Sequence, residues 1–233
     1  MDVPLGLWLG TFVGVVVVGA LVAGEAVRAG APGVGAAIGA WFVAGALLAW
    51  AGAFATDEGT WVPVIGLGIA GPIVVGAWLL RRPGPVAALA ERLPLGWVIR
   101  VQLFRVVGAV FLVAWALDLM PAAFALPAGV GDVAVGLAAP FAARRLERDP
   151  VGGRRTAVLW NVAGITDLVV AVTLGFLTAP SHLQQLAHSD ANYAITRMPF
   201  VLIPVFGVPL AILLHVVVLR RLAASAEVVP TLA

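Results

Sequence analysis

Residues 97–117, WVIRVQLFRVVGAVFLVAWAL, decide the fold, because they form an apolar run interrupted by only two charged side chains. A transmembrane helix needs ~20 mainly apolar residues to cross a hydrocarbon layer ~30 Å thick. Comparable runs recur along the chain, and together they predict an all-α fold, a seven-helix transmembrane bundle. The predicted spans are Leu5–Gly24, Val34–Phe54, Trp61–Leu80, Trp97–Leu117, Phe124–Ala143, Thr156–Leu177 and Phe200–Leu219.

The composition of the 233 residues agrees with this prediction. Hydrophobic residues make up 62% of the chain and charged residues 11%, whereas a soluble domain is about 45–50% apolar and ~25% charged. The net charge is only +2 and the basic residues are scattered over the ends of the spans, which argues against nucleic acid as a partner. The absence of cysteine excludes disulfides and thiolate metal sites.

All 14 basic residues are arginines, and their distribution predicts the orientation of the chain. Basic residues in short loops stay on the cytoplasmic side of a membrane. With the N-terminus outside and the C-terminus cytoplasmic, Arg197 lies outside, Arg105 lies within a span, and the other arginines are cytoplasmic. We therefore expect an integral protein of a bacterial inner (plasma) membrane, with the lipid bilayer as its partner. Tryptophans near span ends, where indole rings favour the headgroup level, agree with this: Trp8, Trp61, Trp78, Trp97 and Trp160.

The chain divides into parts of different character. These are a three-span half rich in Gly, Val and Ala (1–80), a cytoplasmic amphipathic connector (81–96), a four-span half with polar residues inside its spans (97–221) and a cytoplasmic tail (222–233). The apolar residues of the connector share one side, which predicts a short interfacial helix. They are Val86, Leu89, Ala90 and Leu93. A tethering and a regulatory role are both open for it.

Glycines four residues apart mark helix faces in the first half. Gly6, Gly10 and Gly14 have this spacing in the first span, and Gly35 and Gly39 have it in the second. Glycine on a helix face lets two backbones approach closely. Such faces pack within the bundle, or they contact a second copy of the chain or a membrane partner, and both explanations stay open.

Ionisable and amide side chains occur inside the spans only from Trp97 onward. Such groups are costly in hydrocarbon, by at least ~2.5–3.5 kcal/mol for a central Arg or Asp, so they face the bundle interior and pair with one another. The set consists of Gln102, Arg105, Asp132, Asn161, Asp167 and His215.

Depth along the helices predicts how these groups pair. At a rise of 1.5 Å per residue, Arg105 lies ~12 Å and Asp167 ~16 Å from the cytoplasmic start of its span, so these two should form an ion pair. Gln102, Asn161 and His215 are expected to form a polar network on the cytoplasmic side. Asp132 is either a second partner of Arg105 or a group that lines an outer cavity.

The glycines around Asp132 remove side-chain bulk, so that another helix or a ligand can approach. They are Gly129, Gly131 and Gly136.

The last span and the loop before it carry weaker signals. Pro204 and Pro209 predict distortion of the seventh helix. Ser181 and Gln184 match a helix capping box, which predicts a short helix through about His188. His182, His188 and Asp190 have poor helical spacing for a metal site, so no metal is expected.

No cofactor is predicted either. The chain has no lysine for a retinal Schiff base. The literal GxGxxG at Gly66–Gly71 lies inside an apolar span without a βαβ unit.

The second half resembles a group of uncharacterised bacterial multi-pass membrane proteins. The resemblance covers about Trp97–Arg221 and rests on QLFRVVG from Gln102, LPAGVGD ending at Asp132, WNVAGITDL from Trp160, and LIPVFGVP from Leu202. That group has no assigned activity, so the resemblance implies no catalytic residue.

Three functions are open on these grounds. The first is a small-solute or proton-coupled transporter, or a solute-binding membrane protein. In it Arg105 binds an anionic group or acts as counter-ion, Asp132 or Asp167 is the protonatable partner, and Gln102, Asn161 and His215 complete the site. The second is a membrane-embedded scaffold or subunit that packs against a partner protein. The third is an intramembrane enzyme in which Asp132, Asp167 and His215 perform acid–base chemistry on a lipid-soluble substrate, so whether the chain is an enzyme stays open.

Overall fold

The computed structural model describes residues 3–58, 61 and 63–227, and all regular elements in these ranges are helices. Seven helical segments are long and apolar enough to span a membrane: Leu5–Arg28, Pro32–Trp50, Val64–Arg81, Leu95–Ala116, Ala122–Arg148, Gly152–Thr178 and Ile203–Ala224. The prediction of seven helices of spanning length in an all-helical fold is confirmed. Orientation in a membrane and the division into two halves stay predictions.

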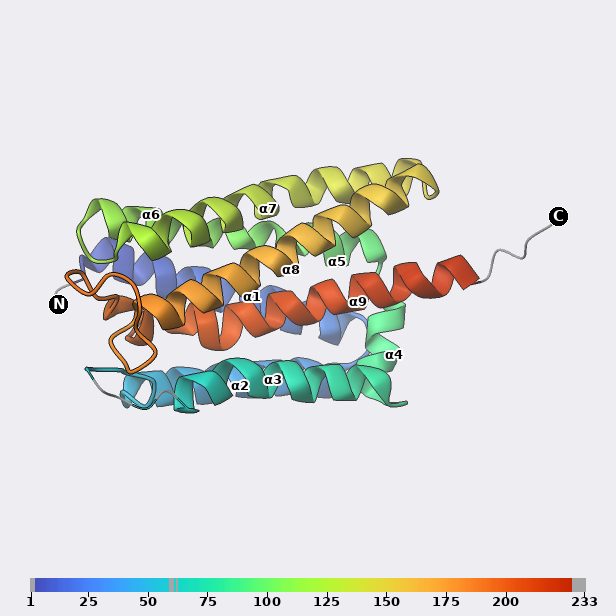
Figure 1. The fold of residues 1–233 in the computed structure, drawn as a ribbon. Helices are drawn as coiled ribbons and strands as arrows, with labels where there is room; N and C mark the ends of the chain where they lie inside the picture. Colours follow the sequence, from blue (N-terminus) through green and yellow to red (C-terminus); the bar gives the residue numbers. More distant parts are fainter. Residues whose placement is uncertain (1–2, 59–60, 62, 228–233) are drawn as a thin grey trace.

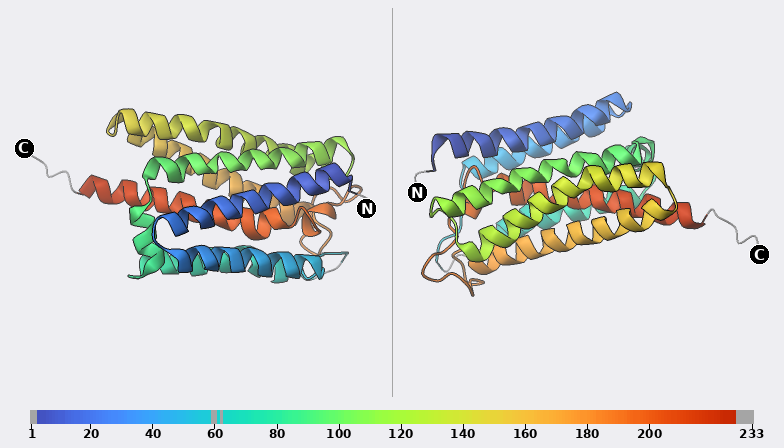
Figure 2. Two further views of the ribbon diagram at one scale, coloured as in Figure 1. Left: turned by 180° about the vertical axis from the view of Figure 1, so that it is seen from behind. Right: turned by 90° about the horizontal axis from the view of Figure 1, so that it is seen from above.

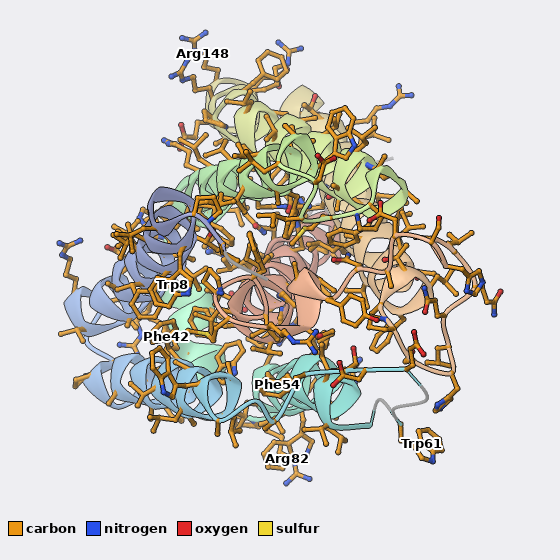
Figure 3. All side chains as sticks on the ribbon, turned by 90° about the vertical axis from the view of Figure 1, so that its left-hand side faces the viewer. Trp8, Phe42, Phe54, Trp61, Arg82 and Arg148 are labelled. Carbon is orange, nitrogen blue, oxygen red and sulfur yellow. The ribbon has the colours of Figure 1, made fainter. Side chains whose placement is uncertain are left out.

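The helices lie nearly parallel and antiparallel to one another in one elongated bundle (Figure 1). Their bounds are α1 Leu5–Arg28, α2 Pro32–Trp50, α3 Pro63–Arg81, α4 Pro85–Arg92, α5 Leu95–Val101, η1 Gln102–Gly108, α6 Ala109–Ala116, α7 Ala122–Arg148, α8 Gly152–Thr178, η2 Ala194–Thr196, η3 Ile203–Gly207 and α9 Val208–Glu227. α1 packs on α2, α3 on α9, and α7 on both α8 and the α5–η1–α6 span. Seen along the bundle axis, α9 lies at the centre with the other helices around it (Figure 3).

The fourth span is not a continuous α-helix. Between α5 and α6 the chain forms the 3₁₀-helix η1. Because a 3₁₀-helix has three residues per turn, residues i and i+3 eclipse each other. Gln102, Arg105 and Gly108 therefore form one line, and all three are buried. Gln102 and Arg105 therefore share one buried face of the fourth helical segment.

The seventh span begins with the π-helix η3, which contains Pro204. Proline has no amide hydrogen to donate to the preceding turn, and the wider π-turn is the form that the predicted distortion takes here. Phe200, Val205 and Phe206 are all buried. The irregular start of this span thus sits in the packed centre of the bundle.

The predicted connector helix is present as α4, Pro85–Arg92. It crosses the end of the bundle between α3 and α5 (Figure 1). Leu89, Ala90 and Leu93 are buried, so the apolar face of the connector turns toward the bundle.

The predicted helix from Ser181 to His188 is wrong, because the chain turns back onto the end of α8 there. The amides of Gln185 and Leu186 both donate to the carbonyl oxygen of Leu177 at 2.9 Å. The side chain of Gln184 donates to the Ala187 carbonyl at 3.1 Å. In a capping box, its side-chain oxygen would instead accept a hydrogen bond from the Ser181 amide. Bonds to the end of α8 replace those of a new helix.

The glycine faces of the first half are used in different ways. A Cβ atom on Gly35 would lie 2.7 Å from the carbonyl oxygen of Ala23, so this glycine permits close packing of α2 on α1. A Cβ atom on Gly14 would lie 3.2 Å from the side chain of Val107. Gly6, Gly10 and Gly39 have nothing within 4 Å of such an atom. Packing within the bundle accounts for two of the five positions, and a homodimer stays a prediction.

The expected orientation is open to a direct test, because the chain has no cysteine of its own. Val151, between α7 and α8, and Ser189, in the loop after α8, are both exposed and lie at opposite ends of the bundle. In intact cells, a membrane-impermeant maleimide should label Ser189→Cys and leave Val151→Cys unlabelled until the cells are lysed. Labelling of Val151→Cys alone in intact cells would contradict the predicted orientation.

Candidate functional site

The predicted site residues Arg105, Asp132 and Asp167 meet between η1, α7 and α8. Nε of Arg105 donates to Oδ1 of Asp132 at 2.8 Å, and Nη2 donates to Oδ2 of Asp167. Nη1 donates to the carbonyl oxygen of Gly164 at 3.1 Å. The Arg105 side chain is 1% exposed, and those of Asp132 and Asp167 are 11% and 13% exposed. All three guanidinium nitrogens are thus paired away from the surface.

The predicted alternatives for Asp132 turn out to be compatible with each other. Asp132 is a second partner of Arg105, and it also lines a pocket. The predicted pairing of Arg105 with Asp167 is present as well. The formal charge of the three side chains is therefore −1 when both carboxylates are ionised.

His215 and Asn161 extend this cluster to the central helix α9. Nδ1 of His215 lies 2.8 Å from Oδ1 of Asn161, and its Nε2 lies 3.4 Å from Nη1 of Arg105. Nδ2 of Asn161 donates to the Ala157 carbonyl at 2.6 Å, which leaves Oδ1 as an acceptor. Because a guanidinium can only donate, the geometry assigns the ring proton to Nδ1 and makes His215 neutral.

Glycine residues provide the space for these side chains. A Cβ atom on Gly108 would meet the side chain of Asp132, and one on Gly131 would meet the carboxylate of Asp167. A Cβ atom on Gly164 would meet the ring of His215 and Nη1 of Arg105. η1, α7 and α8 therefore each have a glycine where a polar side chain from another element lies.

The expected approach of another helix to Asp132 is present. A Cβ atom on Gly136 would lie 3.0 Å from the amide nitrogen of Val106, and one on Gly129 would lie 3.2 Å from the carbonyl oxygen of Gly108. These two glycines allow α7 to pack tightly on η1.

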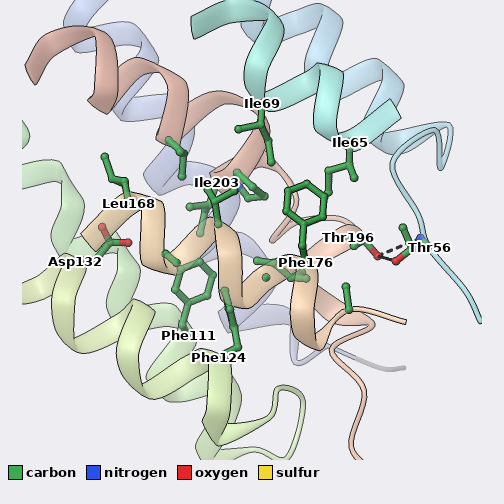
Figure 4. A pocket seen from close by; sticks show the side chains of 17 residues that line it. Thr56, Ile65, Ile69, Phe111, Phe124, Asp132, Leu168, Phe176, Thr196 and Ile203 are labelled. Carbon is green, nitrogen blue, oxygen red and sulfur yellow. Dashed lines mark hydrogen bonds between the residues drawn. The ribbon is translucent and has the colours of Figure 1, made fainter. Parts of the chain in front are cut away.

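An apolar pocket leads from one end of the bundle to Asp132 (Figure 4). We call it the phenylalanine pocket, because Phe111, Phe124 and Phe176 line it. Its empty space is about 580 Å³ including its open side, and Asp132 is the one charged residue among the described residues that line it. Thr56 and Thr196, whose hydroxyl oxygens are 3.3 Å apart, lie at the end opposite Asp132.

A second pocket of about 400 Å³, including its open side, adjoins the first. We call it the inner pocket. Arg105 and Asp132 both line it, together with Val15 and Val18 of α1. Asp132, Leu168, Ile203 and Val208 line both pockets. Asp132 therefore stands between two mainly apolar pockets, and Arg105 lines one of them.

The prediction that Gln102 joins the network of Asn161 and His215 is wrong. Both ring nitrogens of His215 already face other groups, Asn161 and Arg105. Gln102 instead donates to the carbonyl oxygen of Ala211 at 3.0 Å, and its own Oε1 has no partner among the described residues.

Trp160 is a part of the site that the sequence analysis did not assign to it. It is 7% exposed, and its Nε1 donates to the Val135 carbonyl at 3.0 Å. Its ring centroid lies 4.9 Å from that of His215. The sequence does hold a signal for this contact, because Trp160 and Gly164 are four residues apart and therefore share a helix face. Gly164 lies against the ring of His215.

Within the described ranges, no group of three or more His, Cys, Asp or Glu residues is arranged to hold a metal ion. His182, for which a metal role was considered, packs edge-on against Trp61, with ring centroids 5.0 Å apart.

The model of the family described as "Domain of unknown function (DUF8737)" matches residues 62–223, and the chain belongs to this family. The match begins before the third span and includes all the residues of the ion cluster. It therefore starts earlier than the resemblance seen from Trp97 onward. No curated protein and no solved structure matches the chain.

Substitution of Gly131 by alanine should break the contact between Asp167 and Arg105, because the new methyl group takes the place of the carboxylate. Overpacking of this kind costs typically ~1–3 kcal/mol, so the thermal unfolding midpoint of the detergent-solubilised protein should fall. Gly39→Ala is the matched control, since nothing lies near its Cβ position. In an Asp167→Ala background, no carboxylate meets the new methyl group. Addition of Gly131→Ala to Asp167→Ala should therefore not lower the unfolding midpoint further. Equal effects of Gly131→Ala and Gly39→Ala would refute the proposed role of Gly131.

Proposed function

We propose that this member of the family described as "Domain of unknown function (DUF8737)" is a polytopic membrane protein that binds a small lipid-soluble cation and exchanges it for a proton. The phenylalanine pocket is the binding site, and Asp132 supplies the countercharge. The observation that carries this proposal is the surplus carboxylate: one guanidinium faces two aspartates at the end of an apolar pocket.

The charge balance of the cluster supports the exchange. One carboxylate neutralises Arg105, and the neutral His215 adds no charge. The second carboxylate would leave an uncompensated negative charge away from water, which is strongly unfavourable. A proton or a bound cation removes that charge. Because both neutralise the same group, binding of one favours release of the other.

The choice of Asp132 as the exchanging group rests on its position. Asp132 lines both pockets, whereas Asp167 lines neither. Asp167 stays packed against Gly131 and bonded to Nη2 of Arg105. Asp167 is therefore the permanent partner of Arg105, and Asp132 is the carboxylate that a ligand reaches.

The walls of the phenylalanine pocket suit a lipid-soluble cation. Aromatic faces attract cations electrostatically, and apolar walls favour a ligand with little polar surface. Anions are disfavoured, because the charged side chain that lines this pocket in the described part of the chain is a carboxylate.

Two irregular helical segments flank the cluster and suit a change of conformation. η1 carries Arg105, and Ile203 and Pro204 of η3 line the phenylalanine pocket. Short 3₁₀ and π segments inside helices often mark hinges or functional sites. Movement at these segments would expose Asp132 to one side of the membrane and then to the other.

Binding of tetraphenylphosphonium to the purified protein in detergent tests the proposal, with calorimetry as the readout. The affinity should rise from pH 6 to pH 8, by at most about tenfold per pH unit, because one proton competes with the cation. Asp132→Asn should abolish binding, because the amide cannot supply the countercharge. Asp118→Asn, which removes an exposed carboxylate at a position that asparagine tolerates, should leave binding unchanged.

A second test uses a variant that blocks the pocket and leaves the ion cluster unchanged. It tests the proposal even if Asp132→Asn does not fold. Ala171 lines the phenylalanine pocket, whereas its neighbour Val170 is exposed. Ala171→Trp should abolish binding and Val170→Trp should preserve it. The proposal fails if the wild-type protein does not bind the cation between pH 6 and pH 8, or if Ala171→Trp binds as well as Val170→Trp.

A further inference from the structure

A third and larger pocket lies away from the ion cluster, between α1, α2, α3, α4 and α9. Its empty space is about 1220 Å³ including its open side, and none of the described residues that line it is charged. Along α9 it reaches from Leu210 to Val217, a distance of ~10 Å at 1.5 Å per residue. We call it the lipid pocket, for the reasons that follow.

The helices around the lipid pocket form two pairs. α2 packs mainly on α1, and α3 mainly on α9. Residues of all four helices line the pocket, and α4 lies across one end of the bundle (Figures 1 and 2). The apolar face of α4, including Val86, Leu89 and Leu93, lines that end. The predicted interfacial helix therefore closes a cavity.

Arginines gather at the end of the bundle where α4 lies. Arg81, Arg82, Arg92 and Arg220 form no ion pair with a carboxylate among the described residues. Arg221 contacts Glu91 at 3.8 Å. The rim of the lipid pocket thus carries a surplus of positive charge.

Several of these arginines are held close to the pocket itself. Nη1 of Arg220 donates to the carbonyl oxygen of Leu80, a lining residue. Nη1 of Arg92 donates to the Ala29 carbonyl at 3.1 Å, which connects α4 to the end of α1. The guanidinium of Arg82 lies 4.4 Å from the ring centroid of Trp78, an exposed residue outside the lining, and it points away from the bundle (Figure 3). Hydrogen bonds to backbone carbonyls therefore hold Arg92 and Arg220 at this end of the apolar cavity.

We propose that this pocket binds an anionic phospholipid, with part of an acyl chain inside and the phosphate at the arginines. The acyl chain fits the uncharged lining, and the phosphate matches the fork of guanidinium donors. Basic pockets between membrane helices recognise anionic headgroups in this way. Charge complementarity selects this occupant over a zwitterionic lipid, and this site does not depend on the cation site at Asp132.

Native mass spectrometry of the detergent-solubilised protein tests the acyl-chain part of the proposal. The protein is incubated with phosphatidylglycerol or with phosphatidylcholine of identical acyl chains. The wild type should retain one phosphatidylglycerol and lose phosphatidylcholine. Ala37→Trp, which fills the pocket, should lose the bound lipid. Ala36→Trp on the adjacent exposed position should retain it, since Ala36 is outside the lining.

The headgroup part is tested by the double variant Arg81→Gln/Arg82→Gln, which should lose the preference for phosphatidylglycerol over phosphatidylcholine. Arg148→Gln removes an exposed arginine from the end of α7, away from α4, and should keep the preference. Asp132→Asn should leave lipid retention unchanged, so this test is separate from that of the cation site. Equal retention of both lipids by the wild type, or of phosphatidylglycerol by Ala37→Trp and Ala36→Trp, would overturn the proposal.

Discussion

A buried guanidinium needs acceptors on all its nitrogens, and in this protein the arrangement of the second half follows from that requirement. Arg105 obtains its acceptors from Asp132 on α7 and from Asp167 and Gly164 on α8, and it faces His215 on α9. One side chain thus connects four spans. In a protein without lysine or cysteine, such a polar centre fixes the register of helices whose surfaces are otherwise aliphatic and weakly directional.

The glycines and the irregular segments explain how this centre fits between closely packed helices. Gly108, Gly131 and Gly164 leave room for the side chains of neighbouring elements. The 3₁₀ geometry of η1 aligns Arg105 with Gly108 on the buried side. The same centre borders the two mainly apolar pockets that meet at Asp132. Tight packing and a carboxylate that lines two pockets therefore occur side by side at one point.

Sequence reasoning identified the features that depend on local composition and on the cost of buried charge. The spans, the apolar face of α4 and the pairing of Arg105 with Asp167 belong to this class. The features it missed depend on competition between partners in three dimensions. Gln102 donates to the Ala211 carbonyl, because both ring nitrogens of His215 already have partners. Trp160 donates to the Val135 carbonyl. The amides of Gln185 and Leu186 donate to the end of α8. No periodic pattern encodes which of several acceptors a side chain reaches.

Proton release upon cation binding tests the central claim most directly. Calorimetric titration of the purified protein with tetraphenylphosphonium, in buffers of different ionisation enthalpy, gives the number of protons transferred to the buffer. If Asp132 exchanges a proton for the cation, the titration should show proton release of at most one proton per bound cation, and this release should decrease as the pH rises from 6 to 8. Binding without any proton release between pH 6 and pH 8, or unchanged release in Asp132→Asn, would contradict the account.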